Sequence, residues 1–131
     1  MKPTTHFLIV DDYSNIRKLV KTQLNEFGIT NVSEADSVDS AIALLTSNTN
    51  PPIEFILSDW NMPAKSGLDL LKWARSQSQY KNTPFLILTT ENEQAKIMTA
   101  IGAGVSNFLL KPWESDELSE KILLCWKKHN P

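Results

Sequence analysis

Six side chains of this 131-residue sequence have types suited to catalysis or metal binding, and each follows closely on a short apolar run. They are Asp11, Asp12, Asp59, Thr89, Thr90 and Lys111. Three carboxylates close together repel one another, so a protein keeps such a group where a cation offsets the charge. Three ionised aspartates carry −3, and a divalent cation with one lysine carries +3. Because oxygen ligands favour a hard cation that leaves room for a phosphate oxygen, we infer Mg²⁺ and phosphoryl transfer.

Asp59 is the carboxylate best placed to act as the nucleophile. An aspartate needs no general base at neutral pH, because its ordinary pKa of about 3.9 leaves it ionised. If the apolar runs are neighbouring strands, Asp59 lies between the metal-side pair Asp11 and Asp12 and the side that carries Thr89 and Lys111. A single aspartate or threonine in such a place is as often a turn or helix cap as a ligand. The complete set is what favours a site.

The elements that must position these residues alternate regularly along the chain. Apolar runs with β-branched content predict buried strands, and an amphipathic stretch after each predicts a helix. The predicted strands are 7–10, 31–35, 53–58, 85–88 and 108–110. This pattern predicts an α/β fold, a (βα)5 doubly wound parallel sheet with helices on both faces. Ligands of such sheets bind beyond the carboxyl ends of the strands, where the six side chains would meet.

Signals within the helices add detail to this prediction. We expect Ser37 to cap the second helix and Gly28 to end the first in a left-handed conformation. Apolar residues recur at helical spacing and are expected to face the core. Among them are Leu19, Met98 and Ile101.

Composition limits the class of protein. The chain has 15 acidic and 13 basic residues, and its single cysteine, Cys125, can form no internal disulfide. No stretch reaches the roughly 18 apolar residues of a membrane span, and no signal peptide precedes the first strand. The basic residues are scattered, which argues against sequence-independent DNA binding. We therefore expect one cytoplasmic domain, residues 1–131, that binds neither membrane nor DNA.

Four segments resemble the receiver domains of two-component response regulators, and most of all those of the chemotaxis type. They are FLIVDDYS at 7–14, SDWNMP at 58–63, LTTE at 88–91 and LKPW at 110–113. The resemblance implies a flavodoxin-like sheet with the strand order 2-1-3-4-5. It implies that a sensor histidine kinase, or its phosphotransfer domain, passes a phosphoryl group to Asp59. The Mg²⁺ ligands it implies are the side chains of Asp12 and Asp59, Asp11 mostly through water, and the backbone carbonyl of Asn61.

The resemblance also implies how the signal leaves the site. Lys111 would pair with the phosphoryl oxygens, and its bond to Pro112 would be cis. Thr89 would be the switch hydroxyl, and Phe108 would rotate inward as Thr89 moves toward the phosphoryl group. The surface formed by the fourth helix, the fifth strand and the last helix would then change shape for a downstream protein, such as the flagellar switch.

Several residues bear on the rate of hydrolysis, on the switch and on the choice of partner. Asn61 and Glu91 stand where the family sets how quickly the phosphoryl group is hydrolysed, and both match the fast chemotaxis type. Phe108 stands where chemotaxis regulators usually have tyrosine, and Thr90 where most members have a small residue. The acidic stretch 91–94 differs from the basic start of this helix in motor-binding regulators.

Three other functions use a similar fold or nucleophile. A flavodoxin would need a hydroxyl- and glycine-containing phosphate loop after the first strand, where this chain has Asp11 and Asp12. A phosphatase of the haloacid dehalogenase type would need an aspartate two positions after its nucleophile, where this chain has Asn61. A receiver cut from a multidomain transcriptional regulator, which dimerises on phosphorylation, stays as the alternative. We expect a stand-alone receiver, monomeric or dimerising, with self-phosphorylation and self-dephosphorylation chemistry rather than conventional enzyme activity.

Overall fold

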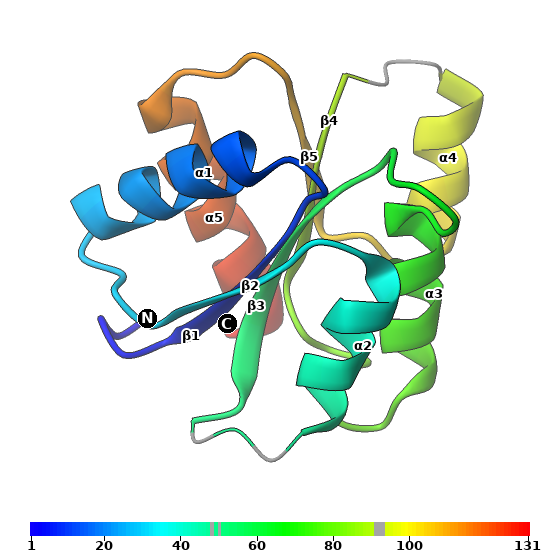
Figure 1. Ribbon diagram of the computed structural model, residues 1–131, viewed down its shortest axis with the longest axis horizontal. Helices are drawn as coiled ribbons and strands as arrows, with labels where there is room; N and C mark the ends of the chain where they lie inside the picture. The colour runs from blue at the N-terminus through cyan, green and yellow to red at the C-terminus, as the bar shows by residue number, and fades with distance from the viewer. Residues whose placement is uncertain (48, 50, 91–93) are drawn as a thin grey trace.

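The computed structural model describes residues 1–47, 49, 51–90 and 94–131, and in these residues five strands alternate with five helices. The strands are β1 (His6–Val10), β2 (Val32–Ala35), β3 (Ile53–Asp59), β4 (Phe85–Thr89) and β5 (Asn107–Leu110). The helices are α1 (Ser14–Glu26), α2 (Val38–Thr46), α3 (Gly67–Ser76), α4 (Gln94–Gly102) and α5 (Ser115–His129). All strand pairs are parallel, in the order β2-β1-β3-β4-β5, which confirms the predicted fold and strand order (Figure 1).

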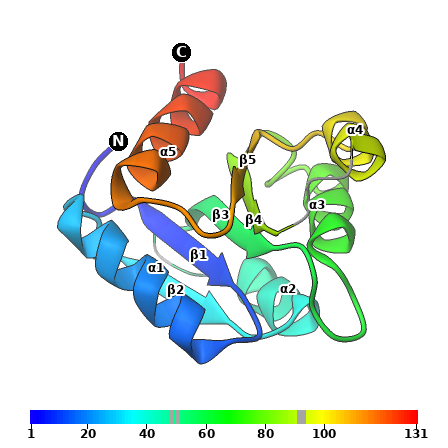
Figure 2. The ribbon, with the colours of Figure 1, turned by 90° about the horizontal axis from the view of Figure 1, so that it is seen from above.

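Helices cover both faces of the sheet. α1 and α5 lie against one face, and α2, α3 and α4 lie against the other (Figure 2). Successive side chains of a strand point to opposite faces, so Phe7 and Ile9 enter the cluster beneath α1 and α5. Leu8 and Val10 enter the cluster beneath the other three helices. A strand that is buried on both faces has no solvent-facing position, which is why 7–10 is continuously apolar.

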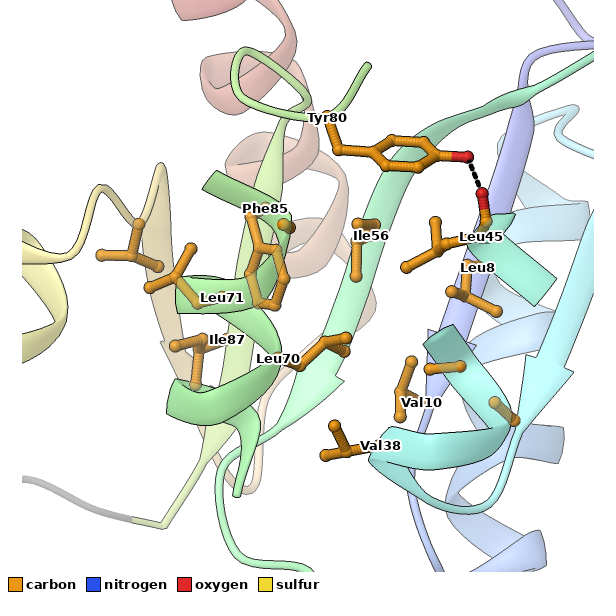
Figure 3. Packing of buried hydrophobic residues seen from close by; sticks show 14 of the residues in the cluster. Leu8, Val10, Val38, Leu45, Ile56, Leu70, Leu71, Tyr80, Phe85 and Ile87 are labelled. Atoms are coloured by element: carbon orange, nitrogen blue, oxygen red, sulfur yellow. Dashed lines mark hydrogen bonds between the residues drawn. The ribbon is translucent and has the colours of Figure 1, made fainter. Parts of the chain in front are cut away.

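The amino-terminal edge of the sheet is fastened by two side chains of the α3–β4 region. Tyr80 is buried, and its hydroxyl donates a hydrogen bond to the carbonyl of Leu45 at the end of α2 (Figure 3). The guanidinium of Arg75 donates to the carbonyls of Gly104, Tyr80 and Thr83 at 2.9, 3.0 and 2.7 Å. These bonds are accepted by carbonyls in the last turn of α2 and in the loops before β4 and β5, so they order the edge opposite the predicted site.

The predicted helix ends are confirmed at both positions. The side chain of Ser37 accepts a hydrogen bond from the backbone N–H of Ser40 at 3.1 Å, which caps α2. Gly28 follows α1 with a φ of 88°, a conformation that a side chain would strain. In the part of the chain that is described, no helix has the length and apolar character needed to cross a membrane.

The prediction that Leu19, Met98 and Ile101 face the core was wrong. These side chains are 46%, 58% and 54% exposed. In α4 the buried side chain is Ala100, and Ile97 is partly buried, so this helix contacts the sheet over a narrower stripe than its apolar residues occupy. Periodicity shows that a helix has an apolar side, whereas the covered width depends on which elements pack against that side.

The last turn of α5 is fastened to the segment before β5 through His129. Its Nε2 lies 2.7 Å from Oγ of Ser106, and the same Oγ accepts a hydrogen bond from the backbone N–H of Phe85 at 2.9 Å. Burial lowers the pKa of His129, and the positive charges of Arg75 and Lys128 lower it further. The folded protein therefore favours the neutral imidazole at this contact.

This contact makes stability depend on pH in one direction. The unfolded chain binds the proton at the ordinary pKa of 6.5, above that of folded His129, so stability falls as the pH drops from 6.5 through the lowered value. We expect acidification from about pH 7 to about pH 5 to lower the Tm of the wild type more than that of His129→Gln, which does not titrate. Thermal melts of both proteins measure this difference. Equal shifts in the two proteins would contradict the prediction.

Candidate functional site

Parallel pairing brings four strand ends to one edge of the sheet, the upper edge in Figure 1. The last register pairs of these strands are Val10 with Ser58, Asp59 with Leu88, and Thr89 with Leu110. The ends of β3 and β4 thus lie beside the residues that immediately follow β1 and β5. Residues separated by as many as 100 positions in the chain meet there, as the sequence predicts.

An acidic cluster forms at this edge. One carboxylate oxygen from each of Asp11, Asp12 and Asp59 lies within 4.8 Å of the others. Asp11 is 2% exposed and Asp59 6% exposed. Oδ1 of Asp12 is buried and has no hydrogen-bond partner among the described residues, although buried acceptors are normally satisfied. An orphaned oxygen beside two further carboxylates fits a hard cation such as Mg²⁺.

Lys111 places its ammonium group against two of these carboxylates. Nζ lies 3.1 Å from Oδ1 of Asp59 and 3.4 Å from Oδ2 of Asp11. The peptide bond between Lys111 and Pro112 is cis, as the resemblance implies. One lysine faces three carboxylates, so the charge deficit predicted from the sequence exists in the folded site.

The electrostatic environment of Asp59 disfavours its charge. Burial raises the pKa of Asp59 above the ordinary 3.8, because the carboxylate loses hydration. The charge of Lys111 acts against this rise, whereas the charge of Asp11 adds to it. A hydrogen bond at 2.8 Å from the backbone N–H of Trp60 to Oδ1 also lowers the pKa. Since the net change is a rise, one lysine does not offset the burial, and a second positive charge would stabilise the ionised form.

Two contacts hold the segment that carries the first aspartates. Nη1 of Arg17 donates to the backbone carbonyl of Asp11 at 2.7 Å, and its Nε donates to Glu34 on β2 at 3.1 Å. The backbone N–H of Tyr13 donates to Oδ1 of Asp11 at 2.9 Å. Main chain and side chain of Asp11 are thereby both fixed. No sequence pattern indicates this role for Arg17, because Glu34 lies 17 residues away.

The loop after Lys111 is anchored to α1 by a pair of side chains that sequence analysis missed. The indole N–H of Trp113 donates to Oε1 of Gln23 at 2.8 Å. Gln23 is buried, 8% exposed, on the face of α1 that packs against the sheet. A buried amide oxygen that accepts this bond fixes the start of the β5–α5 loop, and so restricts where Lys111 can reach. A glutamine within an amphipathic helix carries no sign of such a partner.

Gly67 is a further residue whose importance is apparent only in the structure. Its backbone N–H donates to the carbonyl of Trp60 at 2.8 Å, which closes the loop between β3 and α3. A Cβ atom at this position would lie 2.2 Å from the backbone oxygen of Asp59. The loop therefore approaches the main chain of Asp59 more closely than any side chain would allow.

We expect Gly67→Ala to destabilise the protein by about 2–3 kcal/mol, because neither the new methyl group nor the Asp59 carbonyl can move without backbone strain. Urea denaturation measures the change. Gly102→Ala is the matched control, since a Cβ at Gly102 meets nothing within 4 Å, and its stability should be unchanged or raised by up to about 1 kcal/mol. If Gly67→Ala changed the free energy of unfolding as little as Gly102→Ala, the close approach of the loop to the main chain of Asp59 would be contradicted.

The remaining predicted site residues have different surroundings. Thr89 is fully buried at the end of β4, and Phe108 on β5 packs partly buried against the cluster beneath α2, α3 and α4. Asn61 and the exposed Thr90 line an open pocket of about 390 Å³ together with Asp12, Asp59 and Lys111. Glu91, which the resemblance gives a role in hydrolysis, lies outside the described residues.

Comparison with known protein families gives a match over most of the chain. The family model of the response regulator receiver domain matches residues 7–123. The chain belongs to the response regulator receiver family. This receiver is therefore a two-component signalling protein, in a family whose members generally use aspartate phosphorylation and Mg²⁺.

Individual relatives show which members of the family this chain resembles. The chemotaxis protein CheY of Pseudomonas aeruginosa is 37% identical over 123 residues, which are 94% of this chain and 97% of the relative. CheY1 of Helicobacter pylori is 39% identical over 115 residues, 88% of this chain and 91% of the relative. The structure of the chemotaxis response regulator CheY4 of Vibrio cholerae superposes with a TM-score of 0.83 at 33% identity, covering 93% of this chain and 98% of that one. This receiver is closely related to the CheY chemotaxis regulators.

Proposed function

We propose that this receiver takes a phosphoryl group onto Asp59 from the phosphohistidine of a sensor histidine kinase or its phosphotransfer domain, in a Mg²⁺-dependent reaction. The observation that carries the proposal is the position of Lys111, whose Nζ lies 3.1 Å from Asp59 beside an acidic cluster with an orphaned oxygen. A carboxylate nucleophile, an ammonium group and an oxygen-lined cation site are the parts that phosphoryl transfer requires.

In the proposed step a carboxylate oxygen of Asp59 attacks phosphorus. The O–P bond forms as the N–P bond breaks, and the imidazole of the donor leaves with the electron pair of that bond. The backbone N–H of Trp60 orients Asp59, and the ammonium of Lys111 pairs with the phosphoryl oxygens. Bound Mg²⁺ would supply further positive charge to those oxygens. The residues that would hold it are Asp11, Asp12, Asp59 and, through its backbone carbonyl, Asn61.

We assign the conformational switch to Thr89 and Phe108. Thr89 lies at the end of β4, one strand away from Asp59, and Phe108 sits beside Ile87 in the register of β4 and β5. Movement of Thr89 toward a phosphoryl group would open space for Phe108 to turn inward, and the outer surface of α4, β5 and α5 would change with it.

The proposed output surface is the face formed by α4, β5 and α5. Met98, Ile101 and Leu110 are each about half exposed on these elements, and exposed apolar groups of this kind support contact with a protein partner. Because the relatives are chemotaxis proteins, we assign the output to motility, with a downstream protein such as the flagellar switch as the partner.

Hydrolysis at the same site would limit the lifetime of the phosphorylated state. A receiver spanning residues 1–131 would take phosphate from small phosphodonors and lose it again by hydrolysis at the same site. Asn61 and Glu91 would set the rate of hydrolysis, and Thr90 at the rim of the pocket would slow the entry of small phosphodonors.

Phosphate uptake from acetyl phosphate tests the site. We expect the wild type to be phosphorylated with Mg²⁺ and to stay unmodified in excess EDTA, as seen on gels that retard phosphoproteins. Asp59→Asn should take up none, because the amide is not nucleophilic. Asp39→Asn, at an exposed carboxylate on α2 that pairs with Lys65, should match the wild type. Uptake by Asp59→Asn at the wild-type level would overturn the assignment.

A further inference from the structure

A groove of about 460 Å³ lies at the amino-terminal edge of the sheet, away from the aspartates. Its walls come from the N-terminal tail, from residues 27–29 after α1, and from α5 between Ser119 and Lys127. Figures 1 and 2 both place the N-terminal tail near the end of α1 and the C-terminal half of α5. The volume falls in the range of about 300–1,000 Å³ that is typical of small-molecule sites.

The floor of the groove is apolar. It is formed by Phe27 at the end of α1 and by Ile122, Leu123 and Trp126 on α5. Leu123 is 50% exposed, and Trp126 is partly buried against the core cluster beneath α1 and α5. A ligand with an apolar body would remove this surface from water.

The tail that forms one wall is held in place by hydrogen bonds. The backbone N–H of Lys2 donates to the hydroxyl of Thr5 at 3.0 Å, and the backbone N–H of Thr5 donates to the carbonyl of Lys2 at 3.0 Å. Asn31 donates from its side chain to the carbonyl of Thr4 at 3.1 Å. These bonds hold the tail in position as a wall of the groove.

The charge lining the groove has one sign. Lys2 and Lys127 both contribute to its lining, and no acidic side chain does so. Within the described ranges, neither ammonium group forms an ion pair. Cations without an ion-pair partner around an apolar floor complement a ligand with an apolar body and an anionic head.

We propose that this groove binds a small amphiphilic anion, such as a medium-chain carboxylate, with its chain over Ile122 and Trp126 and its head between Lys2 and Lys127. The site is separate from the phosphoryl-acceptor site and does not depend on it. α5 belongs both to the groove and to the proposed output surface, so an occupant would rest directly on an element of that surface.

Titration with octanoate, followed by ¹H–¹⁵N NMR, tests the proposal. We expect saturable shifts of the indole resonance of Trp126, with the resonance of Trp73 on α3 as an internal control. Octylammonium has the same chain and the opposite charge, and it should bind at least about tenfold more weakly because two lysines repel it. Both ligands are used below their micelle concentrations.

Charge-reversal variants separate the groove from general surface charge. Lys2→Glu with Lys127→Glu should abolish the preference for octanoate over octylammonium, whereas Lys128→Glu, one position further along α5 and outside the groove, should keep it. The three positions are on the surface, so the fold should survive these changes. Shifts that do not saturate, equal binding of the two ligands, or an unchanged preference in the double variant would overturn the proposal.

Discussion

Lys111→Met should destabilise the metal-free protein by about 2–3 kcal/mol and lower phosphate uptake from acetyl phosphate by about 100-fold or more. The ammonium lies 3.1 Å from Asp59 and 3.4 Å from Asp11, and both carboxylates are almost fully buried. Removing it leaves two buried charges without their cation. The cost is below that of a fully buried pair, because the Lys111 side chain is itself 18% exposed. Urea denaturation in EDTA measures the first effect.

The same variant should behave differently once Mg²⁺ is present. Bound Mg²⁺ would neutralise the carboxylates that have lost the ammonium group, so the loss of stability should shrink, whereas the loss of phosphate uptake should persist. Lys65→Met is the matched control. Lys65 pairs with Asp39 at 2.7 Å, but both side chains are largely exposed, so we expect the stability to be nearly unchanged and the phosphate uptake to be normal. Equal costs for the two lysines would show that burial does not strengthen the Lys111 contacts.

The general layout of the site could be predicted because the sheet itself determines it. Continuous apolar runs such as 7–10 occur where a strand is covered on both faces, and parallel strands place their carboxyl ends at one edge. Asp11, Asp59 and Lys111 meet for that reason, and their charges could be summed before any distance was known. The strand order came instead from the resemblance to receivers, because apolar periodicity does not specify which strands are neighbours.

The supporting contacts could not be predicted, because each depends on tertiary proximity alone. The bond from Trp113 to Gln23 joins residues 90 positions apart, and a glutamine on a helix has no pattern that indicates a buried partner. Gly67 gives a signal of turn propensity, but its contact with the Asp59 carbonyl requires the folded loop. The prediction that Met98 and Ile101 lie in the core was wrong for the same reason, since their exposure is set by what α4 packs against.

Asp12→Asn should remove the stabilisation by Mg²⁺ while leaving the metal-free protein as stable as the wild type or more stable. In the metal-free protein Asp12 adds a third negative charge to a cluster that contains one lysine, and its buried Oδ1 has no partner among the described residues. Taking away this charge relieves repulsion. With Mg²⁺ at 100 times its Kd, the free energy of unfolding of the wild type should rise by about 2.7 kcal/mol.

The free energy of unfolding of Asp12→Asn should rise far less at the same Mg²⁺ concentration. If the loss of the carboxylate weakens Mg²⁺ binding about 100-fold, the rise falls to about 0.4 kcal/mol. Thermal melts with and without Mg²⁺ measure both quantities, and Asp39→Asn, which removes an exposed carboxylate on α2, should keep the wild-type gain. The opposite signs of the two effects separate a metal ligand from a structural residue, because damage to the fold would lower stability in both conditions. If Mg²⁺ stabilised Asp12→Asn as much as it stabilises the wild type, this carboxylate would be excluded from the cation site and its orphaned oxygen would have no explanation.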